Sequence, residues 1–336
     1  MHIWFATQHS HEPWLQQTPA GDGAWKDIRY TIKAGGEECI WLSVYDEPSG
    51  DIKTCAPWQQ RILFVSEPPA LKQYPKDYVD QFGIVVSPCP FLYPIKGEWV
   101  RTQACLNWHY NAKRSQTESY AGSLVPVSHA WQDMKKEQGP KERLVSTITS
   151  RKTMLPIQIQ RVRFIEALLR RMGEGSLHVY GRDDNFVETK ADAIRRYRYH
   201  IVLENNIIPH FWTEKIADCY IGEAYPLYCG CPNLEAYFPK ESFIPINVFD
   251  IDKACAIVEE TCNTNIWEQN HNAIIEAKRL VMEDYNVFAV IARIIKNRPE
   301  RKEKQSAKSM IYPSTHFRHR QHALKRFIFD WKKEEA

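Results

Sequence analysis

Residues in the second half of the chain have the types and spacing needed to hold a diphosphate. Thr213, Glu214 and Lys215 open a predicted helix that follows a strand ending at Glu204-Asn205. A cation at a helix N-terminus is disfavoured unless an anion also lies there. A phosphate would supply that anion, and Glu214 could accept hydrogen bonds from ribose hydroxyls. The alternative is a solvent-exposed Glu-Lys pair, which such a pattern forms more often.

Arg161 lies in the first turns of another predicted helix, after a strand at residues 144–149. A guanidinium at this place could form two parallel hydrogen bonds to a pyrophosphate. An arginine taken alone is more often an ordinary surface residue. The pattern therefore leaves both interpretations open.

Glu67 follows an apolar run at residues 62–66 and precedes Pro68-Pro69. The end of a strand provides a rigid, partly exposed carboxylate, and the two prolines stiffen the turn behind it. Such a carboxylate can take the proton from an attacking hydroxyl. By itself, a glutamate before two prolines is usually a loop residue without a catalytic role.

The elements around these residues alternate between strands and helices. In the second half we predict strands at 144–149, 177–180, 199–203 and 225–229, with helices between Pro156 and Gly173 and from Thr213 onward. Strand–helix–strand units of this length indicate a parallel, doubly wound sheet. Strands are also predicted at 3–6, 39–44, 62–66 and 84–87. The polar run at 131–143 marks the domain boundary. The predicted organisation is an N-terminal domain (1–135), a linker (136–143), a C-terminal domain (144–298) and a tail (299–336).

Composition limits the class of protein. The 336 residues are enough for about two domains, and 43% hydrophobic with 25% charged residues is typical of a globular protein. The sequence contains neither a bilayer-spanning apolar window nor a secretory signal pattern. Nine scattered cysteines indicate reduced thiols and a cytoplasmic location.

The C-terminal tail is basic, because residues 301–336 hold ten Lys and Arg against four Asp and Glu. From residue 314 onward its apolar side chains have helical spacing. They are Phe317, Leu324, Phe327, Ile328 and Trp331. A basic amphipathic helix of this kind suits an anionic membrane surface, which would make the protein peripheral to the inner face of the membrane. The alternative is a helix packed back on the N-terminal domain. Nucleic-acid binding is not predicted, because the remainder of the chain is slightly acidic.

Five successive segments resemble the α-1,3/α-1,4-fucosyltransferase family, in its bacterial form. They are Arg161–Leu168, Val179–Arg182, Tyr197–Asn205, Thr213–Asp218 and Phe238–Ile244. The resemblance implies a GT-B fold, an α/β fold of two facing Rossmann-like domains with parallel sheets. It also implies GDP-fucose as the donor and inversion at the anomeric carbon, with no cofactor and no required metal.

The resemblance also implies roles for single residues. Arg161 and Lys215 would hold the diphosphate, and Glu214 and Asn205 would contact ribose or fucose. The remaining donor-binding residues are Tyr180, Phe211 and Thr213. Asn206 departs from the family's usual Ser or Thr, and Phe211-Trp212 replaces an aromatic that is commonly Tyr.

In the family's N-terminal domain, which binds the acceptor, a glutamate after a short strand is the general base, and Glu67 fits that description. Trp108 and His109 are the candidate acceptor-binding residues, and a core role for Trp108 stays open. Asp250-Ile251-Asp252 resembles a metal-binding Asp-X-Asp, but a loop or helix cap is favoured. No metal site is predicted.

These observations together predict an inverting transferase. It would move fucose from GDP-fucose to a glycan or lipid-linked oligosaccharide, forming an α-1,3 or α-1,4 linkage. Two alternatives stay open from the sequence. One is a transferase for another GDP-activated sugar, and the other is a non-catalytic glycan-binding relative.

Overall fold

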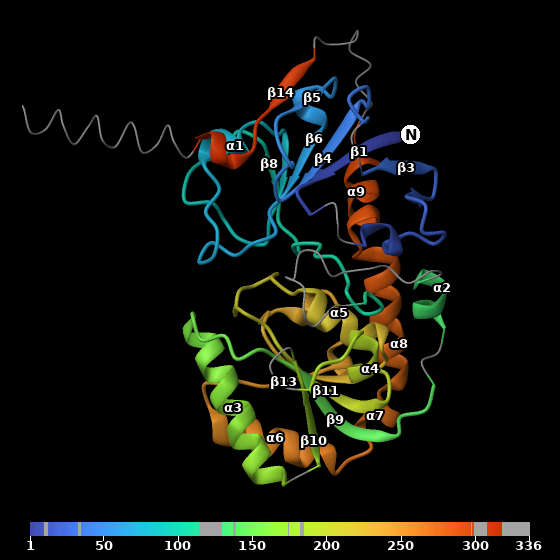
Figure 1. The fold of residues 1–336 in the computed structure, drawn as a ribbon, viewed down its shortest axis with the longest axis vertical. Helices are drawn as coiled ribbons and strands as arrows, with labels where there is room; N and C mark the ends of the chain where they lie inside the picture. Colours follow the sequence, from blue (N-terminus) through green and yellow to red (C-terminus); the bar gives the residue numbers. More distant parts are fainter. Residues whose placement is uncertain are drawn as a thin grey trace, which may run out of the picture. The chain divides into compact units, whose positions relative to one another are not determined.

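The computed structural model describes residues 1–9, 13–32, 35–113, 130–136, 139–173, 175–181, 185–296, 298 and 308–317. The chain forms two compact units (Figure 1). The first contains Met1–Ser10, Lys26–Ala104 and Arg298–Ala336, and the second contains His11–Trp25 and Cys105–Asn297. Among the described residues, none of the helices combines the length and apolar character needed to cross a membrane.

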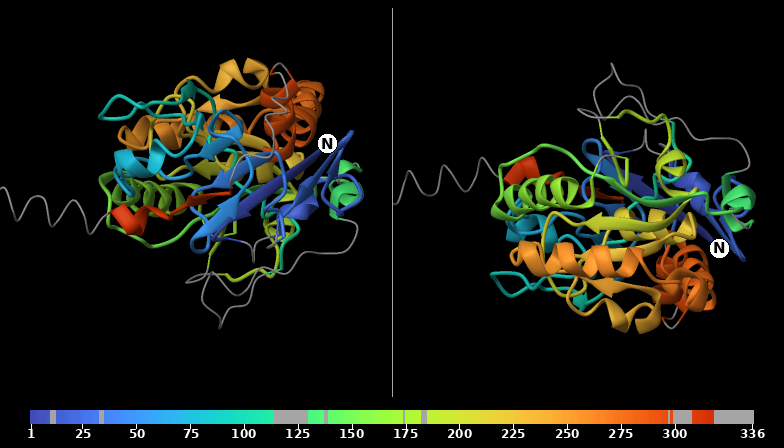
Figure 2. Two further views of the ribbon diagram at one scale, coloured as in Figure 1. Left: turned by 90° about the horizontal axis from the view of Figure 1, so that it is seen from above. Right: turned by 90° about the horizontal axis from the view of Figure 1, so that it is seen from below.

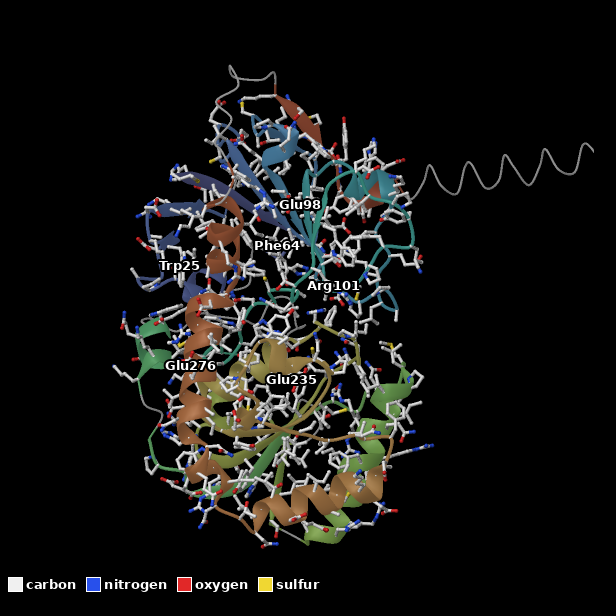
Figure 3. The ribbon with its side chains drawn as sticks, turned by 180° about the vertical axis from the view of Figure 1, so that it is seen from behind. Trp25, Phe64, Glu98, Arg101, Glu235 and Glu276 are labelled. Carbon is white, nitrogen blue, oxygen red and sulfur yellow. The ribbon has the colours of Figure 1, made fainter. Side chains whose placement is uncertain are left out.

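The first unit is built on a parallel sheet with the strand order β3-β1-β4-β6-β7-β8. The strands are β1 (His2–Thr7), β3 (Ile28–Thr31), β4 (Trp41–Tyr45), β6 (Arg61–Phe64), β7 (Ile84–Val86) and β8 (Glu98–Val100). The central strands are almost wholly buried, and Phe64 lies inside the unit (Figure 3). Alternate residues of β1, β4 and β6 pack with the short helix α1 (Lys76–Val79) and Phe82. The four strands predicted here are confirmed to within about two residues at each end.

The chain returns to this unit near its C-terminus. Strand β14 (Ser309–Ile311) pairs antiparallel with β5 (Ile52–Thr54), which precedes a 3-10 turn, η2 (Trp58–Gln60). Ile311 is fully buried and Phe317 is 8% exposed, and both belong to the core cluster of this unit. Residues 308–317 are therefore structural parts of the first unit.

The second unit contains a five-stranded parallel sheet in the order β10-β9-β11-β12-β13. The strands are β9 (Arg143–Ile148), β10 (Leu177–Tyr180), β11 (Tyr197–Leu203), β12 (Tyr225–Cys229) and β13 (Ile244–Pro245). Helices α3 (Pro156–Met172), α4 (Lys190–Ile194) and α5 (Glu214–Ile221) connect successive strands, and α6 (Ile251–Cys262) follows β13. The predicted parallel α/β fold class is confirmed in both units.

Local sequence signals explain where these helices begin. Pro156 occupies the first turn of α3, where its missing N–H costs nothing. The Thr213 side chain accepts a hydrogen bond from the backbone N–H of Lys215 and so caps α5. Asp250 caps α6 through the N–H of Lys253, which confirms the helix-cap interpretation of the Asp-X-Asp motif. Helices α3 and α6 lie side by side and are joined by an ion pair between Arg171 and Glu259 (Figures 1 and 2).

Further helical elements complete the second unit. They are η1 (Trp14–Gln17), α2 (Ala130–Lys135), η3 (Leu234–Ala236), η4 (Lys240–Ser242), α7 (Ile266–Gln269), α8 (His271–Arg279), the π-helical η5 (Leu280–Asp284) and α9 (Val287–Lys296). A two-residue strand, β2 (Ala24–Trp25), lies near η1 in sequence.

The division of the chain differs from the predicted boundary at 136–143. Gln17 donates a hydrogen bond to Asn107 (Nε2 to Oδ1, 2.5 Å), and the rings of Trp108 and Trp131 lie 6.0 Å apart. These contacts join residues 105–136 to the second unit, although they precede the polar run in sequence. The polar run contains most of α2, whose Trp131 and Met134 are buried, and it lies within the second unit rather than at the boundary between units.

Candidate active site

The N-terminus of α5 is bound by a buried carboxylate at the end of β11. Glu204 is 1% exposed, and its Oε1 accepts a hydrogen bond from the backbone N–H of Thr213 at 3.0 Å. The Thr213 hydroxyl donates to Glu204 Oε2 at 2.7 Å. Glu204 therefore connects the end of the strand to the start of the helix, a role that the sequence did not distinguish from that of its neighbour Asn205.

The positive charge of Lys215 is balanced by two carboxylates in this structure. Its Nζ lies 3.3 Å from Glu204 Oε2 and 3.3 Å from Glu214 Oε1. Burial alone would lower the pKa of Lys215, but these two carboxylates raise it above its ordinary value. An anion does lie at this helix start, but in this structure the two carboxylates supply it, so the position of Lys215 does not by itself require a phosphate. The side chain is nevertheless 24% exposed, so its ammonium can be approached from outside.

Glu214 also lies in a network of opposite charges. Its carboxylate is 3.6 Å from Nζ of Lys190, which forms a second ion pair with Asp218 at 2.6 Å. Burial by itself would raise the pKa of Glu214, but Lys215 and Lys190 lower it below its ordinary value. Glu214 is thus ionised at neutral pH and can accept hydrogen bonds. Lys190 and Asp218 were not predicted, because nothing in their sequence spacing links them to the helix start.

Arg161, on α3, differs from Lys215 and Lys190 because its guanidinium contacts neutral oxygens instead of carboxylates. It is 4% exposed, and its guanidinium donates to neutral oxygens: Asn205 Oδ1, Thr149 Oγ1 at 3.1 Å and, more distantly, the carbonyl of Glu204 at 3.5 Å. Its Nε is buried without a hydrogen-bond partner, and none of the described carboxylates forms an ion pair with it. Burial accordingly lowers its pKa. Arg161 is thus a buried cation with an N–H group that has no hydrogen-bond acceptor. An anionic ligand would stabilise such a group.

The structure therefore brings Arg161, Asn205, Thr213, Glu214 and Lys215 into one network at the carboxyl ends of β9 and β11. This edge is where open parallel sheets bind ligands. The neighbouring Asn206 has a buried Oδ1 without a hydrogen-bond partner. The network thus retains unused donor and acceptor atoms.

Two further donor-binding predictions are not connected to this network by a described contact. The hydroxyl of Tyr180 lies 2.6 Å from that of Tyr197, which accepts a hydrogen bond from Arg143 at 3.0 Å. Phe211 is 2% exposed, and its backbone N–H donates to Ile208. Their predicted donor contacts stay predictions.

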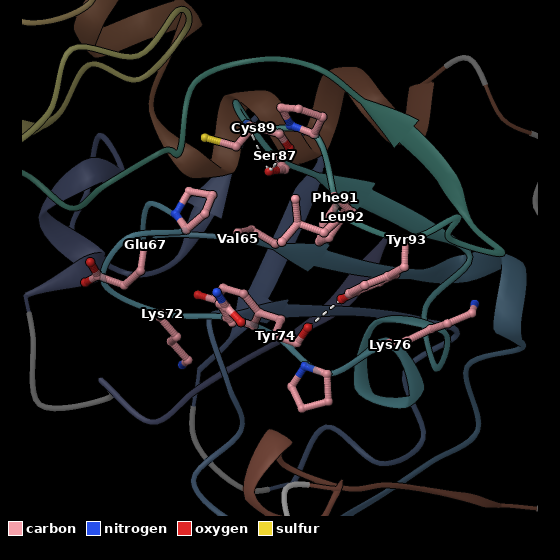
Figure 4. Close-up of a pocket in the computed structure, with 14 residues that line it drawn as sticks. Val65, Glu67, Lys72, Tyr74, Lys76, Ser87, Cys89, Phe91, Leu92 and Tyr93 are labelled. Carbon is pink, nitrogen blue, oxygen red and sulfur yellow. Dashed lines mark hydrogen bonds between the residues drawn. The ribbon is translucent and has the colours of Figure 1, made fainter. Parts of the chain in front are cut away.

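The candidate base, Glu67, lies in the first unit beyond the end of β6. Its side chain is exposed and lines the rim of a pocket of about 260 Å³ (Figure 4). The pocket is formed by the segments that follow β6 and β7, at the carboxyl edge of the parallel sheet. An exposed carboxylate at such an edge can meet a hydroxyl group of a bound molecule.

Asp46 and Glu47, which follow β4, are less suitable as bases because they are buried and already paired. Nζ of Lys72 lies 2.8 Å from Asp46 Oδ1 and 2.6 Å from Glu47 Oε1. Asp46 also accepts hydrogen bonds from Gln8 at 2.5 Å and from Tyr74. Burial would raise the pKa of Asp46, but hydrogen bonding to His9 and the charge of Lys72 lower it. We call Asp46, Glu47 and Lys72 the buried charge cluster.

The candidate acceptor-binding residues lie in the interior of the second unit. Trp108 is 2% exposed and packs on Trp131, as the alternative core interpretation predicted. His109 is 5% exposed, and its backbone N–H donates to Asp218 at 3.0 Å. An acceptor role for either side chain is not supported by this burial.

The nine cysteines carry free thiols.

Part of the second unit matches a family of known proteins. Residues 138–263 match the family model described as glycosyltransferase family 10 (fucosyltransferase), C-terminal region. A solved α1,3-fucosyltransferase with GDP-fucose is similar with a TM-score of 0.47 and 15% identity, over 85% of this chain and 92% of that one. The same kind of enzyme with GDP gives a TM-score of 0.46 and 16% identity, over 86% and 92%. No curated protein matches the chain at a significant level.

Proposed function

We propose, from the match of residues 138–263 to the model of glycosyltransferase family 10 (fucosyltransferase), that the chain transfers fucose from GDP-fucose to a hydroxyl of a glycan or lipid-linked oligosaccharide. The main support for the proposal is the environment of the Arg161 guanidinium. The residue is 4% exposed, and its Nε–H has no hydrogen-bond acceptor. A diphosphate supplies the negative charge and the acceptor atom that this group lacks.

On the donor side, we propose that Arg161 and the accessible ammonium of Lys215 bind the diphosphate oxygens. Glu214, ionised and beside Lys215, accepts hydrogen bonds from ribose hydroxyls, while Asn205 holds the guanidinium in place through its Oδ1. Fixed positive charges stabilise the negative charge that develops on GDP as the glycosidic bond breaks. In this proposal they make a bound metal unnecessary.

On the acceptor side, we propose that Glu67 is the general base. The acceptor hydroxyl oxygen forms a bond to the anomeric carbon while the bond from that carbon to the diphosphate oxygen breaks. The hydroxyl proton passes to the carboxylate of Glu67, and GDP leaves with the bonding electron pair. The configuration at the anomeric carbon is inverted in this single displacement. The product is an α-1,3 or α-1,4 linkage.

The test is the release of GDP from matched donors. With a mixture of soluble oligosaccharide acceptors, GDP-fucose should be consumed and GDP-mannose should not. The Arg161→Ala variant should lose this activity, whereas Arg163→Ala should keep it, because Arg163 is an exposed arginine on the same helix. Consumption of GDP-mannose in preference to GDP-fucose would assign the chain to another GDP-sugar. Equal activity of the Arg161 variant and the wild type would exclude the proposed diphosphate site.

A further inference from the structure

The segment that carries Glu67 leaves the sheet of the first unit as a tight turn. The backbone N–H groups of Leu71 and Lys72 both donate to the carbonyl of Pro68, at 2.9 and 3.1 Å. Glu67 and Leu71 are exposed, whereas Tyr74, where the chain returns to the core, is 6% exposed. A functional group on an exposed turn keeps one position only when buried neighbours fix its backbone. The contacts of Tyr74 therefore decide how well Glu67 is held.

The hydroxyl of Tyr74 contacts both the buried charge cluster and the backbone of the candidate base. It donates a hydrogen bond to Asp46 Oδ1. Burial and the charge of Asp46 raise the pKa of Tyr74 well above its ordinary value, whereas contacts with the Ser66 side chain and the Glu67 backbone lower it. A contact that lowers the pKa of a phenol donates a hydrogen bond to its oxygen. One hydroxyl thus links Glu67 to Asp46, using its single donor and its acceptor capacity.

Asp46 is a rigid anchor for this hydroxyl. Its φ is 62°, in the left-handed region that residues other than glycine rarely adopt. Its backbone N–H donates to the carbonyl of Phe64 at 2.9 Å, which joins the end of β4 to the end of β6. Its Oδ1 lies 2.8 Å from Nζ of Lys72. A rare backbone conformation persists only where several contacts determine it, and such residues cluster at functional sites.

The ring of Tyr74 is fixed as well. It belongs to the core cluster of the first unit and stacks on the ring of Tyr78, with 6.2 Å between the ring centroids. The Tyr93 hydroxyl donates to the Tyr74 carbonyl at 2.5 Å. Because the backbone, the ring and the hydroxyl are all held, Tyr74 can fix the position of the turn that it contacts.

We propose that Tyr74 is a positioning residue for the general base. The inference rests on the proposed function and deepens it, because it names the group that determines where the Glu67 carboxylate lies. The hydroxyl, anchored by Asp46, fixes the backbone of Glu67 and so keeps its carboxylate at the rim of the pocket (Figure 4). Tyr74 itself exchanges no proton with the acceptor.

Tyr74→Phe keeps the buried ring and removes only the hydroxyl. Turnover should fall by roughly 10–100-fold, because a displacement of about 1 Å at a reacting group can cost a factor of this order. The affinity for GDP and the KM for GDP-fucose should not change, since the diphosphate network belongs to the second unit. Tyr30→Phe is the matched control and should keep wild-type turnover. Tyr30 is a 4% exposed tyrosine on β3 that does not line the pocket.

A double-mutant cycle separates positioning from a general structural role. Single-turnover measurements compare Tyr74→Phe in the wild-type chain and in the Glu67→Gln chain. If Tyr74 acts through the carboxylate, its substitution should slow the Glu67→Gln chain by less than about twofold. A structural role would slow both chains by the same factor. Equal factors, or wild-type turnover of Tyr74→Phe, would overturn the proposal.

Hydrogen exchange in the wild type tests the contact itself and does not depend on the folding of a variant. After correction for intrinsic rates, the backbone N–H of Glu67 should exchange at least about tenfold more slowly than that of Ala70, an exposed residue of the same turn. Equally fast exchange of the two groups would overturn the proposal.

The Glu67→Gln chain by itself tests the proposed function. If it keeps the turnover of the wild type, the base assignment fails and the positioning role fails with it. If it loses turnover while Tyr74→Phe slows both chains equally, only the positioning role fails and the proposed function stands.

Discussion

Ser314 donates two hydrogen bonds to the carboxylate of Glu47, from its backbone N–H at 2.9 Å and from its hydroxyl at 2.6 Å. The two residues are 267 positions apart in sequence. Glu47 is at the same time paired with Lys72, which lines the pocket beside Glu67. The returning C-terminal segment thus contacts the buried charge cluster, one member of which, Lys72, lines the pocket beside Glu67.

The first prediction concerns the stability of truncated chains. Removing residues 308–336 deletes Ile311 and Phe317 from the core and leaves Glu47 without the two donors of Ser314. Loss of one buried aromatic side chain alone costs about 3–5 kcal/mol, so this chain should unfold at a clearly lower temperature. A chain ending at Phe317 should melt like the full-length protein. Calorimetric melting of both chains checks this, and equal melting temperatures would contradict it.

The second prediction concerns the basic tail. Its residues 318–336 lie outside the described part of the structure, so the membrane-binding hypothesis stays a prediction. The full chain should co-sediment with vesicles containing phosphatidylserine and not with neutral phosphatidylcholine vesicles, because the tail is basic and amphipathic. The chain ending at Phe317 should remain in the supernatant in both cases. Equal co-sedimentation of the two chains would refute the hypothesis that the tail binds membranes.

The third prediction is a pH dependence of stability that arises from His200. This histidine is 4% exposed, and Ser146 Oγ, 2.8 Å from its Nδ1, already donates to the carbonyl of Ala193. Burial, together with the charges of Lys190 and Lys141, lowers the pKa of His200 to about 3. Between about pH 6.5 and pH 3 the unfolded chain binds the proton that the folded chain does not, so stability falls as the pH decreases.

The His200→Gln variant provides the comparison. Over that pH range the wild type should lose about 1 kcal/mol more per pH unit than the variant, since one titrating group contributes about 1.4 kcal/mol per unit at most. Urea unfolding at pH 7, 6, 5 and 4 measures both slopes. Parallel slopes would show that His200 does not titrate differently in the two states.

The fourth prediction tests the general base. Glu67→Gln keeps the size of the side chain but cannot accept a proton near neutral pH, so turnover should fall by roughly 10²–10⁴-fold. GDP affinity should not change, because Glu67 belongs to the first unit and the diphosphate network to the second. Glu98→Gln is a control at an exposed glutamate of the first unit. Wild-type turnover of the Glu67 variant would refute its role.

How much of the fold the sequence could predict depends on how local the signals are. Pro156 and Thr213 determine helix starts through neighbouring residues, and the parallel strands followed from their apolar composition, so these elements were predicted closely. The return of residues 308–317 and the contact between Gln17 and Asn107 are long-range, and no local pattern encodes them.

The candidate site shows the same limit. Arg161 and Lys215 were found because their positions at helix starts are visible in sequence. Glu204 was missed as a site residue because its burial and its bonds to Thr213 exist only in the folded chain. Trp108 was considered for the acceptor site because aromatic residues suit both sugars and cores, and only its 2% exposure separates the two roles.

The most direct test of the central claim is calorimetric titration of the full chain with GDP, and with UDP as the comparison. The wild type should bind GDP and bind UDP much more weakly. Arg161→Ala should weaken GDP binding by roughly 10–150-fold, the equivalent of about 1.5–3 kcal/mol for hydrogen bonds to a charged group, while Arg163→Ala should bind GDP like the wild type. GDP affinity that is equal in the wild type and the Arg161 variant, or no GDP binding by the wild type, would contradict the claim.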